Sequence, residues 1–118
     1  MVDEEVKKLI EENPVAIATV TEGNKPNVIG VAYVKVVSDD QLVITDNYMK
    51  KTIDDIQENN NVCLVCWDSD MNGCKLIGTA EYFTEGKWLD FVKNLEENKE
   101  EPAKGAILVT VTRVIKSA

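Results

Sequence analysis

The chain has 118 residues, of which 44% are hydrophobic and 29% are charged, and it carries a formal net charge of −8. This length favours one domain, residues 1–118, which can bury a core without disulfides or a structural metal. Nucleic acids and anionic membranes are polyanions, so the negative charge argues against both as partners, and no apolar run is long enough to span a membrane.

The first half of the chain predicts one helix followed by three strands. Val6, Leu9 and Ile10 recur at helical spacing within residues 3–12, and Pro14 follows directly after that helix. Segments rich in β-branched residues then alternate with turn residues such as Gly, Asn, Asp and Pro. The three strands, which we expect to form an antiparallel meander, lie at residues 15–21, 27–37 and 42–45.

The segment after the third strand has the composition of a phosphate-binding turn. A helix is expected to begin near Tyr48, and the first amides of a helix have no intrahelical acceptor and lie at the positive end of its dipole. Lys50, Lys51 and the Thr52 hydroxyl add two cations and a further donor. The alternative is that the lysines simply point into solvent. Because adjacent helical residues point about 100° apart, we expect at least one of them to do so.

The second half of the chain predicts three more strands and one more helix. The helix that begins near Tyr48 ends in three asparagines, and Trp88, Phe91 and Leu95 mark the next helix by their spacing. These strands are expected at residues 62–67, 75–83 and 106–115, and the last helix at about 85–98.

Six strands connected mostly by hairpins, with three short helices, predict an α+β domain. The protein should be mainly antiparallel β, with the sheet closed into a small barrel. Residues 15–18 and 28–32 are apolar on both faces of their strands. One face can fill the barrel, whereas the other needs helices, a ligand or a second subunit, so we favour a homodimer.

The residue types that are missing exclude several kinds of chemistry. The sequence has no histidine, which removes the commonest general base, the serine triad and the commonest metal ligand, and we expect no metal site. A cofactor with its own chemistry does not need histidine. The acidic N-terminus lacks the basic region of a signal peptide, and three cysteines fit a reducing compartment. We therefore expect a cytoplasmic protein.

The three cysteines have no clear role. Cys63 and Cys66 have C-x-x-C spacing, but residues three apart in a strand point to opposite faces, so we expect buried free thiols and neither a metal site nor a dithiol. Cys66 and Cys74 flank a hairpin loop and could approach each other, or form a disulfide in oxidised samples. The loop between them, with Asp68 and Asp70, is expected to be a polar hairpin tip and no calcium site.

Motifs along nearly the whole chain carry a resemblance to a known family. They are the strand at 16–19, Pro26-Asn27-Val28 at the start of the second strand, residues 33–36, Lys51-Thr52 at a helix start, the asparagines at 59–61, and the strands at 62–65 and 77–80. In this order they resemble the pyridoxamine 5′-phosphate oxidase-like, FMN-binding split β-barrels, in particular the small FMN-binding and flavoredoxin-like members. The resemblance implies a six-stranded split β-barrel with short flanking helices.

The resemblance also implies a set of cofactor-binding residues. In this family a basic residue and a hydroxyl at the helix start hold the FMN phosphate, and the preceding turn passes along the flavin. The implied residues are Thr45, Asp46, Asn47, Tyr48, Met49, Lys50, Lys51 and Thr52, with a second wall from the middle of the second strand, Val28, Ile29, Gly30 and Val31. Gly30 is where a backbone can approach a flat ring. Asp55 stands where relatives often have Asn, and it would repel a phosphate unless it points away.

The implied function is that of an FMN-binding flavoprotein with FMN at the interface of a homodimer. It would act in electron transfer or as a small flavin-dependent oxidoreductase, with a redox partner that the sequence does not name. No residue stands out as an obligatory acid or base, so catalytic residues are unassigned and both electron and hydride transfer are consistent. The alternatives are a non-catalytic small-molecule binder or sensor on the same barrel, and a reductase that depends on a deazaflavin coenzyme. Arg113 is the only arginine, which argues against pyridoxine metabolism.

Overall fold

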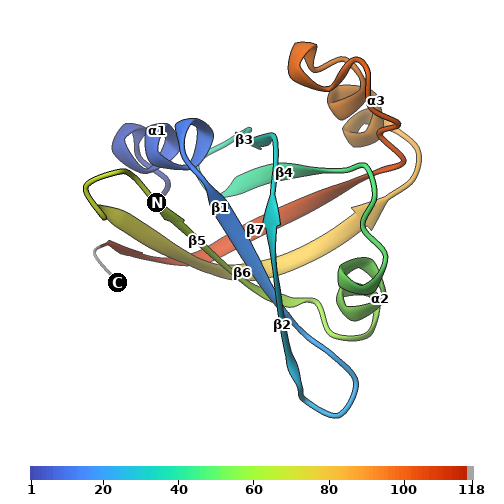
Figure 1. Cartoon of the computed structure of the whole chain (residues 1–118), viewed down its shortest axis with the longest axis horizontal. Coiled ribbons are helices and arrows are strands. Elements are labelled where there is room, and N and C mark those ends of the chain that lie inside the picture. The colour runs from blue at the N-terminus through green and yellow to red at the C-terminus, as the bar shows by residue number, and fades with distance from the viewer. Residues whose placement is uncertain (117–118) are drawn as a thin grey trace.

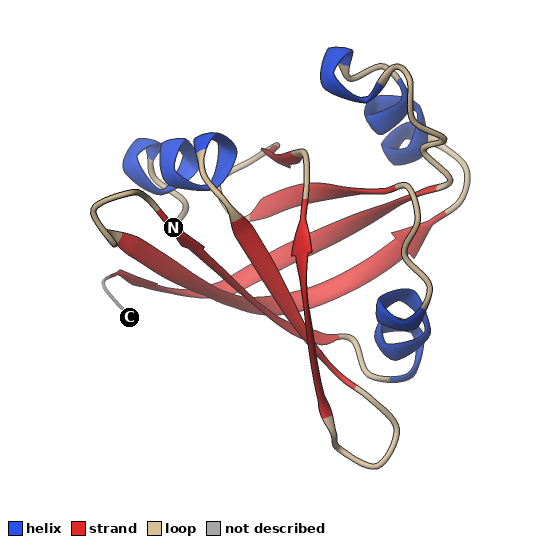
Figure 2. Ribbon diagram, viewed as in Figure 1, coloured by secondary structure: helices blue, strands red, loops and turns tan. Residues whose placement is uncertain are grey.

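Residues 1–116, which the computed structural model describes, form one strongly curled antiparallel sheet flanked by helices (Figures 1 and 2). The elements in chain order are α1 (Glu4–Glu12), β1 (Val15–Val20), β2 (Pro26–Val31), β3 (Val34–Val36), β4 (Gln41–Asp46), α2 (Lys51–Glu58), β5 (Asn61–Trp67), β6 (Gly73–Phe83), α3 (Lys87–Lys93), the 3₁₀ turn η1 (Glu96–Asn98) and β7 (Gly105–Lys116). The predicted α+β class and the mainly antiparallel split barrel are confirmed, with seven strands in place of six.

The order of the strands explains why the sheet curls. The order is β2-β1-β5-β6-β7-β4-β3, so β2 and β3 lie at opposite edges although they follow each other in the sequence. Only Ala32 and Tyr33 separate them. Such a short link can join the two edges only if the sheet bends until they approach each other, which closes the sheet into a barrel with one split.

The prediction of a single strand at residues 27–37 is wrong. Its two halves, β2 and β3, pair with different partners, β1 and β4 respectively. Tyr33 between them has a φ of 58°, a left-handed conformation that a bulky residue rarely adopts and that cannot continue a strand. The expected meander of three strands is therefore two hairpins on opposite edges of the sheet.

Two helices are shorter than expected. α2 begins at Lys51 and not near Tyr48, because the Asp46 carboxylate accepts a hydrogen bond from the Met49 N–H (2.8 Å) and holds residues 46–49 in a turn. α3 covers only part of residues 85–98, since the Asn94 side chain donates to the Asp90 carbonyl (2.8 Å) where the helix ends. The other elements agree with the sequence prediction to within one or two residues at each end.

The barrel interior holds the main hydrophobic core. Alternate residues of each strand point inward, as the register of Ile17 opposite Leu64 and of Leu64 opposite Leu76 illustrates. α1 covers one end of the barrel with Val6 and Ile10, and its N-terminus is capped by the Asp3 carboxylate, which accepts from the Val6 N–H (2.9 Å).

The outer face of the sheet is covered on one half only. A second apolar cluster, with Val43, Leu108 and Val92 among its members, packs α3 against β4 and β7. No helix in residues 1–116 packs over the outer face of β2, β1 and β5, as Figure 2 shows. None of these helices has the length and apolar character that a membrane crossing requires.

Candidate functional site

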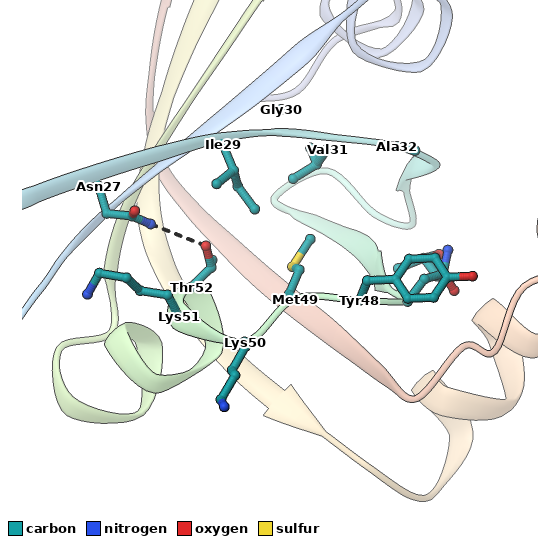
Figure 3. Close-up of a pocket in the computed structure, with 12 residues that line it drawn as sticks. Asn27, Ile29, Gly30, Val31, Ala32, Tyr48, Met49, Lys50, Lys51 and Thr52 are labelled. Carbon is teal, nitrogen blue, oxygen red and sulfur yellow. Dashed lines mark hydrogen bonds between the residues drawn. The ribbon is translucent and has the colours of Figure 1, made fainter.

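One cleft brings together the two segments that the sequence singled out. It has a volume of about 390 Å³ and lies between the inner side of β2 and the turn that leads from β4 into α2 (Figure 3). The lining residues are Asn27, Ile29, Gly30, Val31, Ala32, Thr45, Asn47, Tyr48, Met49, Lys50, Lys51 and Thr52. Every residue of the predicted set except Val28 and Asp46 is among them.

The pleat of β2 explains why Val28 does not line the cleft and why Asn27, which the sequence analysis did not assign, does. Asn27, Ile29 and Val31 are half-buried on the face toward the cleft, whereas Val28 points to the opposite face and is 65% exposed. Neighbouring side chains alternate between the two faces of a strand, so Val28 cannot face the cleft together with Ile29. The same period of two is the signal in the sequence that places Asn27 on the face of Ile29 and Val31.

The start of α2 supplies free hydrogen-bond donors at one end of the cleft. The N-cap is Lys50, and no side chain within residues 1–116 caps the first amides of the helix. Lys51 and Thr52 occupy its first turn, where unpaired N–H groups and the helix dipole favour an anion. The two lysines diverge, with Lys51 extending toward Asn27 and Lys50 extending away from β2 (Figure 3).

Polar side chains behind this helix start form a continuous hydrogen-bonded network. The Asn27 amide Nδ2 lies 3.2 Å from Thr52 Oγ1 and 3.1 Å from Thr19 Oγ1, and the Thr19 hydroxyl donates to Asp55 Oδ2 (2.9 Å). The other carboxylate oxygen, Asp55 Oδ1, lies 3.5 Å from Lys51 Nζ. Asp55 is buried and does not line the cleft. The Asp55 side chain therefore points away from the cleft, which is the condition under which this carboxylate would not repel an anion bound at the helix start.

The middle of the cleft has an apolar wall. The side chains of Ile29 and Val31 on β2 point toward Met49 on the opposite side (Figure 3). Thr45 lines the same cleft, and its buried hydroxyl has no hydrogen-bond partner within residues 1–116. A buried polar atom without a partner is uncommon in a folded protein.

Hydrogen bonds of Asp46 and Asn47 to the rest of the protein hold the turn between β4 and α2 in place. Asp46 is fully buried and accepts from the Tyr82 hydroxyl (2.6 Å) as well as from Met49. Burial and this hydrogen bond to the carboxylate raise the pKa of the Tyr82 phenol. Asn47 exchanges amide hydrogen bonds with Asn98 (2.8 and 3.2 Å), which ties the turn to η1. Asp46 thus supports the cleft without lining it.

The cysteines lie away from the cleft. Cys66 and Cys74 face each other across β5 and β6 with their Sγ atoms 2.9 Å apart, and both are buried. Cys63 lies on the opposite face of β5 and is half-buried, which confirms the expected divergence of the C-x-x-C pair. In residues 1–116 no group of acidic or thiol side chains is arranged to hold a metal ion.

Comparison with known proteins decides the family. The family model described as pyridoxamine 5′-phosphate oxidase matches residues 2–117. The chain belongs to the pyridoxamine 5′-phosphate oxidase family. This chain is similar in sequence to an uncharacterised protein of Methanocaldococcus jannaschii, with 31% identity over 94% of this chain and 77% of that protein.

Solved structures agree with the split-barrel fold of the family. HupZ of group A Streptococcus superposes with a TM-score of 0.92 at 24% identity, over 99% of this chain and 94% of HupZ. An FMN-binding protein of Syntrophomonas wolfei has a TM-score of 0.83 at 15% identity, over 98% of this chain and 85% of that one. At these identities the two structures establish a shared fold.

Proposed function

We propose that this member of the pyridoxamine 5′-phosphate oxidase family is a flavoprotein that binds FMN in the cleft between β2 and α2. The proposal rests on one observation, which is that the lining of this cleft changes from polar at one end to apolar in the middle. Anion-binding donors lie at the α2 end, and apolar side chains from two opposed segments line the middle. FMN has the same arrangement, with a phosphate at one end and a flat ring at the other.

The α2 end has the donors that a phosphate requires. They are the uncapped amides, the Lys51 ammonium and the Thr52 hydroxyl, all within the first turn of the helix. The net charge of −8 would repel a phosphate from most of the surface. A local group of donors is therefore needed to bind it, and this helix start provides one.

The middle of the cleft suits a flat, mainly apolar ring with a polar edge. Ile29 and Val31 would contact one face of the ring, and Met49 lies across from them. As an edge strand, β2 leaves alternate backbone N–H and C=O groups unpaired, and these can bond the polar edge of a ring. The partnerless Thr45 hydroxyl offers a further hydrogen bond at this site.

The chain's residues would bind and orient the ring without acting as acid or base. The titratable side chains among the lining residues are Tyr48, Lys50 and Lys51, and all three are exposed. When bound, FMN supplies the capacity to accept and donate electrons or hydride. The protein would therefore act in electron transfer or as a small flavin-dependent oxidoreductase. Its electron acceptor would be a molecule that reaches the ring from the open side of the cleft.

The functional unit would be a homodimer in which the second copy covers the outer face of β2, β1 and β5. In the register of β2, β1, β5 and β6, two outward rows cross this face, Val28–Ala18–Cys63–Ile77 and Gly30–Ala16–Val65–Lys75. Only Lys75 in these rows is charged, and Val65 is 39% exposed. Two copies related by a two-fold axis would cover the same face on each other. Since β2 belongs both to this face and to the cleft, the second copy would stand beside the ligand.

A deazaflavin coenzyme is the second candidate occupant, because it also combines a phosphate with a tricyclic ring. The visible absorption spectrum of the purified protein, recorded before and after incubation with FMN and gel filtration, tests the proposal. We expect flavin bands that stay with the protein at one FMN per chain, and light scattering that gives the mass of a dimer. Absence of protein-bound flavin after loading would refute FMN binding. Retention of deazaflavin alone would identify the second candidate, and retention of neither would leave a binder of another ligand.

A further inference from the structure

Each hydrogen bond in the network behind the start of α2 has a fixed direction, because the network begins at the Asp55 carboxylate. A carboxylate can only accept hydrogen bonds, so the Thr19 hydroxyl must donate its single hydrogen to Asp55 Oδ2 (2.9 Å). The Thr19 oxygen can then only accept from Asn27. The amide of Asn27 must therefore turn its NH₂ group, and not its carbonyl, toward Thr19 (3.1 Å).

The same NH₂ group sets the role of Thr52. Its second hydrogen points to Thr52 Oγ1 (3.2 Å), so the Thr52 oxygen accepts from Asn27. The hydroxyl hydrogen of Thr52 is left to donate, and Thr52 lines the cleft although the residue as a whole is buried. The direction of each bond is thus determined from Asp55 through Thr19 and Asn27 to the cleft.

We propose that Thr19 and Asn27 are positioning residues that fix the Thr52 hydroxyl as a hydrogen-bond donor to an anionic phosphate group in the cleft. Asp55 contacts both phosphate-binding side chains, Thr52 through Thr19 and Asn27, and Lys51 directly through its second carboxylate oxygen (3.5 Å). The buried carboxylate therefore orients one neutral and one cationic phosphate ligand without entering the cleft. The inference deepens the proposed function, since it concerns the same site, but it requires only that a phosphate group binds there.

Inorganic phosphate is the probe that separates this inference from FMN binding. Its affinity is measured from the shifts of the Lys51, Thr52 and Ile53 amide signals in ¹H–¹⁵N spectra of the full chain. The variants are Thr19→Val and Thr52→Val, singly and together, which form a double-mutant cycle. Thr19→Ser keeps the hydroxyl and is the conservative variant. Thr21→Val, whose hydroxyl bonds the neighbouring Glu22 carbonyl (3.1 Å), is the matched control.

We expect each single valine variant to raise the Kd for phosphate by roughly three- to tenfold, the effect of losing one hydrogen bond from a neutral donor. The double variant should bind phosphate no more weakly than the single variant with the higher Kd, because Thr19 acts through Thr52. Thr19→Ser should restore the affinity, and Thr21→Val should leave it unchanged.

Additive losses in the double variant, or an unchanged Kd in Thr19→Val, would overturn the inference. So would the absence of phosphate-dependent shifts in the unmodified chain. If Thr19→Val fails to fold, Asn27→Ala in place of Thr19→Val completes the same cycle with Thr52→Val. Phosphate binding with the expected cycle but without any FMN binding would refute the proposed function and leave this inference standing.

Discussion

Replacing Lys51 with alanine is the most direct test of the phosphate end of the cleft. Lys51 lies in the first turn of α2 and its side chain is 67% exposed, whereas the adjacent Lys50 points away from β2. The two substitutions remove the same charge at neighbouring positions. Lys50→Ala is therefore a matched control for the general loss of positive charge.

The expected magnitude follows from the contacts of Lys51. A charge-assisted hydrogen bond to a phosphate contributes about 1.5–3 kcal/mol, so Lys51→Ala should raise the Kd for FMN roughly 10- to 150-fold. The loss also leaves the Asp55 carboxylate without its cationic neighbour near the phosphate, which favours the upper part of this range. Lys50→Ala should cost about 0.5 kcal/mol or less, the usual value for an exposed charge without a direct contact. Adding Thr52→Ala to Lys51→Ala should bring the total to roughly 2–4 kcal/mol.

Flavin fluorescence titrations with FMN and with riboflavin, which lacks the phosphate, measure these effects. Lys51→Ala should weaken FMN binding and leave riboflavin binding unchanged, while thermal unfolding of the apoprotein shows that the fold is intact. Equal losses in Lys50→Ala and Lys51→Ala would mean that net charge alone matters and would refute the direct contact. Equal losses for FMN and riboflavin would place the phosphate elsewhere.

Three further predictions concern the dimer, the turn below the cleft and the sheet. Val65→Asp on the outer face should raise the dimer Kd at least ~100-fold by burying a charge, whereas Met71→Asp at a hairpin tip, 77% exposed, should leave the mass by light scattering unchanged. Burial and Asp46 raise the pKa of Tyr82, so the stability that its neutral phenol contributes is complete below pH ~10 and is lost as the pH rises further. Tyr82→Phe should accordingly remove a late step from the alkaline titration of phenolate absorbance, and an unchanged curve would contradict this. In Gly78→Ala the new Cβ would overlap the Thr110 carbonyl, which should lower the free energy of unfolding in urea by about 1–3 kcal/mol.

Local patterns in the sequence predicted most of the elements, because hydrophobic period and turn residues act over a few positions. α1, β1 and the strands of the second half agree with their predicted bounds to within one or two residues. The break at Tyr33 carries no such signal, since Val31 and Ala32 before it and Val34 after it continue an apolar run typical of a strand. It arises because the two halves of that run find partners at opposite edges of the sheet, which is a property of the whole topology.

The same distinction holds for the cleft. That Lys51 and Thr52 lie together at a helix start could be predicted, because a helix start and its residues are adjacent in the sequence. Thr19, Asn27 and Asp55 were not assigned to the site, since the bonds that join them to each other and to Thr52 span 8 to 36 positions. Asp55 was noted only as an unfavourable neighbour, and its burial against Thr19 shows why it is tolerated.

The position of β4 has a consequence for how the chain reaches its folded state during synthesis. β4 is buried along almost its entire length and pairs on one side with the short β3 and on the other with β7, about sixty residues later in the chain. Until β7 has left the ribosome, one side of this apolar strand has no native partner, and pairings this distant in sequence form slowly. A nascent chain that stalls before residue 105 should therefore expose β4 to proteases and chaperones. The complete barrel should form in one late step, when β7 inserts between β4 and β6.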